Sequence, residues 1–275
     1  MNLAENKAVD GALHRFAAVV LIATATLIFP IRNAEPINTP ELKADANETA
    51  VGSSNAAAQA SISAGDTYNC ALSAGAVKCW GFNGLGSLGD GTNTTRSTPV
   101  GVSGLSSGVT AIAANASATC ALLTSGAVKC WGYDFSTNSS TPVEVSGLSS
   151  GVTAIAGSST SGLNFMCALL STGAVKCWGD NTYGRLGNGS TTNSSTPVDV
   201  SGLSGVTAIT AGADHSCALL STGAVKCWGR NGYGEFGNGT TTQSTTPVDV
   251  SGLSGVTAIT SGSGFTCALL TSGAV

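Results

Sequence analysis

Short runs of apolar and β-branched residues follow one another along most of the chain, separated by Gly, Ser, Asn or Pro. The unit that begins at Gly205 shows the arrangement, because it holds four such runs: Val-Thr-Ala-Ile-Thr, Ser-Cys-Ala-Leu-Leu, Ala-Val-Lys-Cys-Trp and Pro-Val-Asp-Val. No unit contains a stretch of about ten residues with the 3.6-residue period of a helix. The pattern therefore predicts four short β-strands in each unit and no helix.

The unit repeats with a period close to 50 residues. The segment Cys217–Gly229 has close copies elsewhere, and the first cysteines of successive copies lie 50, 47, 50 and 50 residues apart. A second block, Thr-Pro-Val-x-Val-Ser-Gly-Leu-Ser, recurs between them and leads into Gly-Val-Thr-Ala-Ile. Four strands in a unit of this length are typical of the blades of a β-propeller. The structural alternative is a β-helix solenoid, whose coils are usually shorter than this.

The chain divides into three parts. The repeats begin near Ala58, so we expect residues 58–275 to form an all-β, incomplete β-propeller of four-stranded blades, with about four to five blades visible and the C-terminus truncated. Residues 35–57 mix Pro, acidic residues, Asn and Ala without periodicity, which predicts a flexible linker. Charged residues make up only 9% of the chain and glycine is abundant, a composition that suits short strands and tight turns.

Residues 1–34 carry a targeting pattern. Basic residues precede the apolar run Phe16–Ile31, which is shorter than the about 20 residues of a membrane-spanning helix and suits the core of a secretory signal peptide. A cut after Ala34 would leave Arg32 at the third position upstream, which makes a poor cleavage site. An uncleaved membrane anchor and a buried helix therefore stay open as alternatives.

Eight of the nine cysteines form local pairs within predicted hairpins. In the copy that contains Cys217 and Cys227, a three-residue turn at 221–223 places the two cysteines opposite each other in a non-hydrogen-bonded pair. Their Cα atoms would lie about 4.5 Å apart, which a disulfide tolerates. In the first copy the cysteines are one residue closer, and a two-residue turn at 74–75 restores the facing. We therefore expect four disulfides: Cys70–Cys79, Cys120–Cys130, Cys167–Cys177 and Cys217–Cys227.

These bridges bear on the compartment and on metal binding. Each closes a loop of about ten residues and contributes roughly 2–3 kcal/mol in the chain-entropy model, and paired cysteines indicate an oxidising compartment. Free buried thiols and a metal site are the alternatives, but zinc sites usually pair cysteines about two to four residues apart, so we predict no metal. The ninth cysteine, Cys267, is expected to be unpaired by truncation, because the sequence ends at Val275, before the next cysteine of the pattern.

Several linked motifs resemble the regulator of chromosome condensation repeat. That family has the pattern Gly-x-x-His-Ser-x-Ala-Leu, Gly-x-Val-x-x-Trp-Gly-x-Asn, Gly-Gln-Leu-Gly-x-Gly and Pro-x-x-Val. The chain shows it as Gly212-Ala-Asp-His-Ser-Cys-Ala-Leu, Gly223-Ala-Val-Lys-Cys-Trp-Gly-Arg-Asn, Tyr233-Gly-Glu-Phe-Gly-Asn-Gly and Pro247-Val. The resemblance covers about residues 58–275 and implies a β-propeller, seven-bladed in the best-known members. In character the chain is closest to secreted bacterial members.

The units are not identical, and some of their recurring side chains have a structural interpretation. The second unit lacks the Gly-rich block, since only 11 residues separate Trp131 from Pro142, and it gains residues around 158–165. It is therefore a candidate for a specialised loop, although drift in a repeat array is the simpler explanation of the change. Recurring tryptophans are expected to pack between blades rather than to serve as carbohydrate platforms: Trp80, Trp131, Trp178 and Trp228.

The composition argues against nucleic-acid binding and catalysis. With 11 Lys and Arg and a net charge of −4, the chain has no basic stripe to displace counterions from nucleic acid. Asp214, His215 and Ser216 are neighbours on one predicted strand and point to opposite faces, so they cannot form a catalytic relay. The Gly-rich segment 183–189 lacks the Lys-Ser/Thr of a phosphate-binding loop. We expect no catalytic residues, no cofactor and no enzyme activity.

The sequence thus predicts a non-catalytic propeller scaffold that binds an unidentified protein or glycan and is exported to the cell surface or the medium. Propeller loops suit this role because they vary on a rigid frame. We expect a monomer that contacts a membrane only through an N-terminal anchor. The resemblance also implies a guanine-nucleotide exchange factor-like regulator of a small GTPase, and a purely structural surface repeat is a further alternative.

Overall fold

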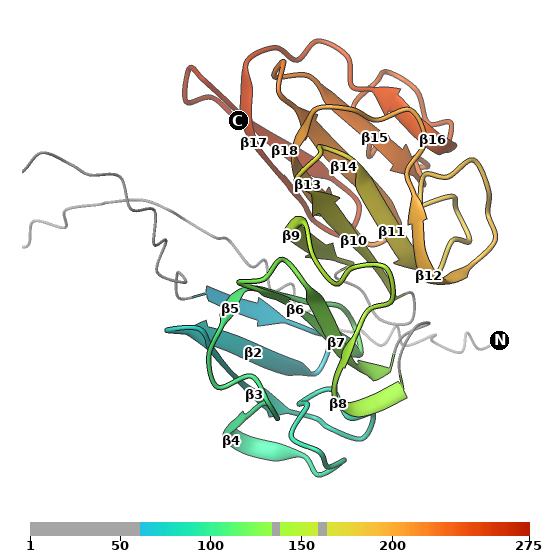
Figure 1. Ribbon diagram of the computed structural model, residues 1–275. Helices are drawn as coiled ribbons and strands as arrows, with labels where there is room; N and C mark the ends of the chain where they lie inside the picture. Colours follow the sequence, from blue (N-terminus) through green and yellow to red (C-terminus); the bar gives the residue numbers. More distant parts are fainter. Residues whose placement is uncertain (1–60, 134–137, 159–163) are drawn as a thin grey trace, which may run out of the picture. The chain divides into compact units, whose positions relative to one another are not determined.

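The computed structural model describes residues 61–133, 138–158 and 164–275, and in these ranges all regular structure is β-strand (Figure 1). The strands form four antiparallel sheets of four strands and a last sheet of two. The prediction of an all-β fold built from four-stranded units is confirmed. Among the described residues, no helix is long and apolar enough to span a bilayer. The predicted signal segment 1–34 and linker 35–57 lie outside the described residues.

Each sheet is a meander, because its strands pair in the order in which they follow one another along the chain. We call the sheets blades 1 to 5. Blades 1 and 2 contain β1 (Ser61–Ala64), β2 (Tyr68–Ser73), β3 (Ala76–Gly81), β4 (Arg96–Gly101), β5 (Val109–Ala114), β6 (Ala118–Leu123), β7 (Val128–Tyr133) and β8 (Asn138–Glu144). Blades 3 to 5 contain β9 (Val152–Gly157), β10 (Phe165–Leu170), β11 (Val175–Gly179), β12 (Ser194–Asp199), β13 (Val206–Ala211), β14 (His215–Leu220), β15 (Val225–Gly229), β16 (Ser244–Asp249), β17 (Val256–Ser261) and β18 (Thr266–Leu270).

The central hairpin of each complete blade is stapled by a disulfide. In blade 4, Cys217 faces Cys227, and the Gly223 amide donates to the Leu220 carbonyl to close the turn. The Cα atoms of every bridged pair lie 4.1 Å apart, a separation typical of a non-hydrogen-bonded pair. The four bridges join the cysteines that the hairpin register pairs: Cys70–Cys79, Cys120–Cys130, Cys167–Cys177 and Cys217–Cys227. Cys267 is a free thiol on β18.

The shorter turn of blade 1 keeps the register by a change of turn type. Ser73 faces Ala76 directly, and the two residues between them, Ala74 and Gly75, have φ angles of 50° and 78°. Two successive left-handed residues are the signature of the tight hairpin turn that matches the twist of the strands. Ala74 is the one described non-glycine residue with a positive φ. The one-residue deletion therefore shortens the turn alone, and Cys70 still faces Cys79.

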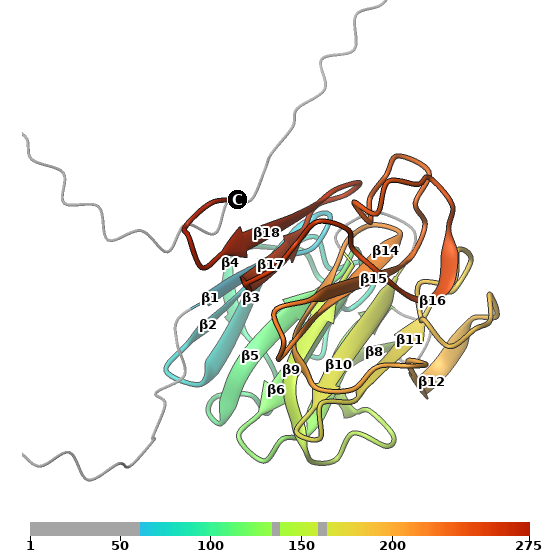
Figure 2. The ribbon, with the colours of Figure 1, turned by 90° about the horizontal axis from the view of Figure 1, so that it is seen from above.

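Successive blades pack through their first strands and through the recurring tryptophans. Strands β1, β5, β9, β13 and β17 contact one another in that order, and Figure 2 shows each sheet beside its predecessor in the chain. Trp131, Trp178 and Trp228 are almost fully buried, and each lies in the apolar cluster of the preceding blade. Trp80 of blade 1 is only half-buried. The three interior tryptophans therefore belong to the interfaces between blades.

Two lysines that recur just before the second cysteine of the hairpin, Lys176 and Lys226, are partly buried and pair with carboxylates of the next strand. The Lys176 ammonium contacts the Asp199 carboxylate at 2.7 Å, and Lys226 contacts Asp249 at the same distance. Both carboxylates are about three-quarters exposed, at 74% and 76%. Exposed pairs of this kind contribute at most about 1 kcal/mol, so these lysines favour solubility rather than mark a site.

Candidate binding face

Blades 1, 3 and 4 each carry a long loop after their third strand. Because neighbouring strands are antiparallel, the loops after the first and third strands emerge at one edge of a sheet, and the other connections emerge at the opposite edge. We call the first edge the long-loop face. Its described loop residues are 65–67, 82–95, 115–117, 158, 164, 180–193, 212–214, 230–243 and 262–265.

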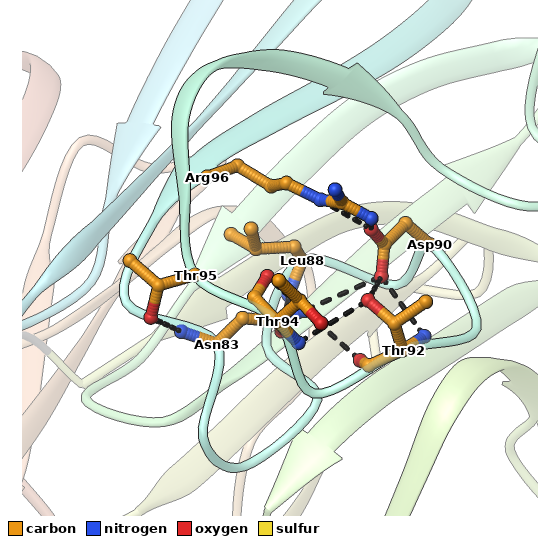
Figure 3. Close-up of polar contacts among 7 residues, drawn as sticks. All are labelled: Asn83, Leu88, Asp90, Thr92, Thr94, Thr95 and Arg96. Atoms are coloured by element: carbon orange, nitrogen blue, oxygen red, sulfur yellow. Dashed lines mark hydrogen bonds and ion pairs between the residues drawn. The ribbon is translucent and has the colours of Figure 1, made fainter.

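A buried asparagine organises the long loop of blade 1 (Figure 3). The Asn83 amide nitrogen donates to the carbonyls of Thr92 and Thr94 and to an oxygen of Asp90, and its amide oxygen accepts the Leu88 backbone amide at 2.9 Å. One side chain thus satisfies donors and acceptors on both arms of the loop. The loops of blades 3 and 4 repeat the arrangement around Asn181 and Asn231.

Asp90 locks the same loop to the start of β4 (Figure 3). One carboxylate oxygen accepts the backbone amide and the hydroxyl of Thr92, at 2.9 and 2.7 Å, and the other accepts two bonds from the Arg96 guanidinium, at 3.1 and 2.9 Å. Burial alone would raise the pKa of Asp90, but the bonds from Thr92 and Arg96 outweigh it and lower the pKa. The loop is therefore held in one conformation by charge-assisted hydrogen bonds.

The Gly-rich turns of the long loops of blades 1 and 3 dock on the tryptophan of the next blade. The Trp131 indole donates to the Ser87 carbonyl at 2.9 Å, and the Trp228 indole donates to the Arg185 carbonyl at 2.8 Å. Trp178 has no hydrogen-bond partner for its indole nitrogen among the described residues, although its side chain is buried. The physical reason is the deletion in the second unit, because blade 2 lacks the turn that would supply the carbonyl.

A chain of alternating charges crosses the junction between blades 3 and 4. The Arg185 guanidinium is fully buried and lies 3.0 Å from an Asp180 oxygen and 2.9 Å from an Asp214 oxygen. The Arg230 guanidinium contacts the second Asp214 oxygen at 3.1 Å. The Tyr183 ring lies 5.4 Å from each guanidinium carbon. Burial lowers the pKa of Arg185 despite the two carboxylates, but the guanidinium keeps its charge.

The Asp214, His215 and Ser216 side chains do not form a relay. His215 is fully buried and its Nε2 atom lies 2.8 Å from the Thr266 hydroxyl of blade 5, whereas Ser216 donates to the Arg185 carbonyl. Burial lowers the pKa of His215, so the ring is neutral at pH 7. Asp214 and Ser216 contact Arg185 of blade 3, and His215 contacts Thr266 of blade 5, so all three make structural contacts across blade junctions.

Five of the nine large apolar side chains that are exposed among the described residues lie on or next to the long-loop face. Phe82, Leu85, Tyr133, Tyr233 and Phe265 are 48%, 45%, 51%, 78% and 58% exposed. Open depressions of about 290 and 320 Å³ lie on either side of Leu85, at the junction of blades 1 and 2. Large apolar groups left in water on one face are typical of an interaction surface. Within the described part of the chain, no group of three or more His, Cys, Asp or Glu side chains could hold a metal ion.

The sequence reasoning missed these exposed residues and the ionic chain. Phe82, Asp180 and Arg230 occupy the variable position of the same Trp-Gly-x-Asn motif, and Ser87 and Arg185 occupy one variable position of the Gly-rich block. Variation at these positions within an otherwise uniform repeat was the available signal. It did not say which of the variable side chains would be buried.

The meandering blades, their order and their rigid loops define a β-propeller fold. A family model described as "Regulator of chromosome condensation (RCC1) repeat" matches residues 74–122, 172–219 and 222–269, and a second model of that repeat matches 109–136, 158–185 and 206–235. The chain therefore belongs to the RCC1 repeat family. Its expected likeness to secreted bacterial members stays a prediction. No curated protein sequence matches the chain.

Solved structures show the same fold. The crystal structure of human WBSCR16 has a TM-score of 0.66 and 23% identity, covering 76% of this chain and 57% of that one. Yeast RCC1 (Prp20) bound to Kap60 has a TM-score of 0.62 and 25% identity, covering 74% and 51%. Prp20p from Saccharomyces cerevisiae has a TM-score of 0.65 and 24% identity, covering 77% and 55%. The chain thus spans a little over half the length of these structures.

Proposed function

We propose that this chain is a non-catalytic propeller scaffold that binds a protein partner through the long-loop face. The observation that carries the proposal is the gathering of exposed apolar side chains on that face, among them Leu85, Tyr133 and Tyr233. Aromatic and aliphatic groups of this kind supply most of the binding energy in protein interfaces.

The rigidity of the frame supports this role. Asn83 and Asp90 hold the first long loop in one conformation, and a disulfide staples each of the four complete blades. A preorganised surface loses less conformational entropy when it binds, so more of its contact energy appears as affinity. The four disulfides also favour an oxidising compartment, which supports the cell surface or the medium as the place of action.

A protein is the better-supported partner than a glycan. Three of the four tryptophans, which are the largest potential sugar platforms, are buried between blades: Trp131, Trp178 and Trp228. Yeast RCC1 (Prp20), a member of the same family, has been crystallised with the protein Kap60 bound.

The test is capture of a partner by the full chain. Immobilised protein is incubated with the extracellular and cell-envelope fractions of its own cells, and bound proteins are identified by mass spectrometry. A variant with Leu85→Asp, Tyr133→Asp and Tyr233→Asp is expected to lose the captured protein, because it places charges on the apolar surface. Val143→Asp, at an exposed position on β8, is the matched control. Undiminished capture by the triple variant would show that the face is not the binding surface.

A further inference from the structure

The junction between blades 3 and 4 shows how the long-loop face accommodates a guanidinium. Arg185 fills the space between the loops, with carboxylates of Asp180 and Asp214 within 3.0 Å. The rings of Tyr183 and Phe165 lie 5.4 and 5.7 Å from its guanidinium carbon. Among the described residues, none of its nitrogens has a well-aligned hydrogen bond, so the contacts are ionic and cation–π in character.

The junction between blades 1 and 2 has the same backbone but a shorter side chain at this position. Ser87 corresponds to Arg185, because the carbonyl of each accepts the indole of the following blade, from Trp131 and Trp228 respectively. The serine does not fill the space that the arginine fills. A depression of about 320 Å³ remains there, the lower end of the range of small-ligand sites.

The walls of this depression are fixed by hydrogen bonds between the two blades. The Ser87 hydroxyl donates to the Ser117 carbonyl at 2.8 Å, and the Asp66 amide donates to the Ala116 carbonyl at 3.3 Å. The Phe82 amide donates to the Thr67 carbonyl of the same blade at 3.0 Å. The cavity is therefore built into the fold rather than left by a loosely held loop.

The chemistry of the depression complements a cation with an apolar stem. Asp66 lines it, is exposed and makes no ion pair among the described residues, so its carboxylate is free to pair with a cation. Phe82 and Leu85 line the same depression with about half of each side chain in solvent. No Lys or Arg contributes to its lining. The carboxylate and the ring are the two kinds of group that surround Arg185 in the other junction.

We propose that this depression receives an arginine side chain of a polypeptide partner, with the guanidinium beside Asp66 and over Phe82 and the aliphatic stem against Leu85. The inference rests on the proposed function and specifies the chemistry of the partner. Arginine suits the site better than lysine, because its planar guanidinium stacks on an aromatic ring and forms paired bonds to a carboxylate. The net charge of −4 of the chain also favours the approach of a basic segment.

The test uses the full chain and a fluorescein-labelled pentapeptide, Gly-Leu-Arg-Leu-Gly, with binding measured by fluorescence anisotropy. Control peptides replace the arginine with citrulline, which keeps the shape without the charge, and with lysine. The arginine peptide is expected to bind saturably. The lysine peptide should bind more weakly than the arginine peptide, and the citrulline peptide more weakly still. Asp66→Asn and Phe82→Ser should each weaken the arginine peptide about two- to five-fold. Glu144→Gln, at an exposed carboxylate on β8, should leave binding unchanged.

Ser87→Arg is the decisive variant, because it would fill the depression with a guanidinium of the chain itself and should abolish binding of the peptide. Equal binding by the Ser87→Arg variant, or equal binding of the arginine and citrulline peptides to the unaltered chain, would overturn the proposal. If the peptide fails to bind but the Leu85, Tyr133 and Tyr233 variant still loses its captured protein, only this inference is wrong. If that triple variant captures normally, the proposed function itself fails.

Discussion

Trp178 differs from the two other interior tryptophans in one respect, and that difference predicts a smaller loss of stability from the same substitution. Trp131, Trp178 and Trp228 are equally buried, but only Trp178 lacks an acceptor for its indole N–H among the described residues. We compare Trp→Phe at the three positions, which removes the N–H and leaves a six-membered ring. The loss of ring area is common to the three variants and cancels in the comparison.

The variants should differ in stability according to what happens to the carbonyl that accepts the indole N–H. Trp131→Phe leaves the buried Ser87 carbonyl without the indole donor, a loss of about 1–3 kcal/mol beyond the common term. In Trp228→Phe the Arg185 carbonyl keeps the Ser216 hydroxyl, so the loss is near the net value of one hydrogen bond, about 1 kcal/mol. Trp178→Phe breaks no hydrogen bond and removes a buried, unpaired donor. It should therefore be the least destabilising of the three by at least about 1 kcal/mol.

The assay is urea unfolding of the full, oxidised chain, followed by circular dichroism and by tryptophan fluorescence. Coincident transitions are required, because stacked blades can unfold in stages. The urea concentration at the midpoint is expected to be highest for Trp178→Phe, lower for Trp228→Phe and lowest for Trp131→Phe. If Trp178→Phe lowers the midpoint as much as Trp131→Phe, the indole of Trp178 is not an unpaired donor and the reasoning about the shortened loop of blade 2 is refuted.

Three further outcomes are expected. Replacing Cys217 and Cys227 together by Ala should lower the free energy of unfolding by about 2–3 kcal/mol in urea titrations, and no loss would contradict a stabilising staple. Since burial lowers the pKa of His215 below 6.5, the unfolded chain binds the extra proton first, and stability should fall as the pH drops through this value. In the His215→Gln variant, the free energy of unfolding should fall less steeply between about pH 7 and pH 5. An unchanged pH dependence would show that His215 does not cause the fall. Asn83→Ala should expose the loop after β3 to thermolysin. Asn93→Ala, at an exposed position whose side chain has no hydrogen bond among the described residues, should not; equal cleavage would show that Asn83 does not hold the loop.

The strands, register and disulfide of a single blade could be predicted from the sequence, because the interactions that form a blade are local. Turn length decides which residues of a hairpin face each other, so the pairing of Cys217 with Cys227 followed from counting outward from residues 221–223. The same counting placed Cys70 opposite Cys79 across a shorter turn. The period near 50 residues and the linked motifs then indicated the propeller.

The differences between the junctions of neighbouring blades could be seen only in the three-dimensional structure. Ser87 and Arg185 occupy the same place in the repeat, yet one leaves a depression and the other is buried between Asp180 and Asp214. The carboxylate of Asp214 comes from the next unit, 29 residues further along the chain. Contacts of this kind depend on which loops meet across an interface, and a nearly uniform repeat carries no local pattern that reports them.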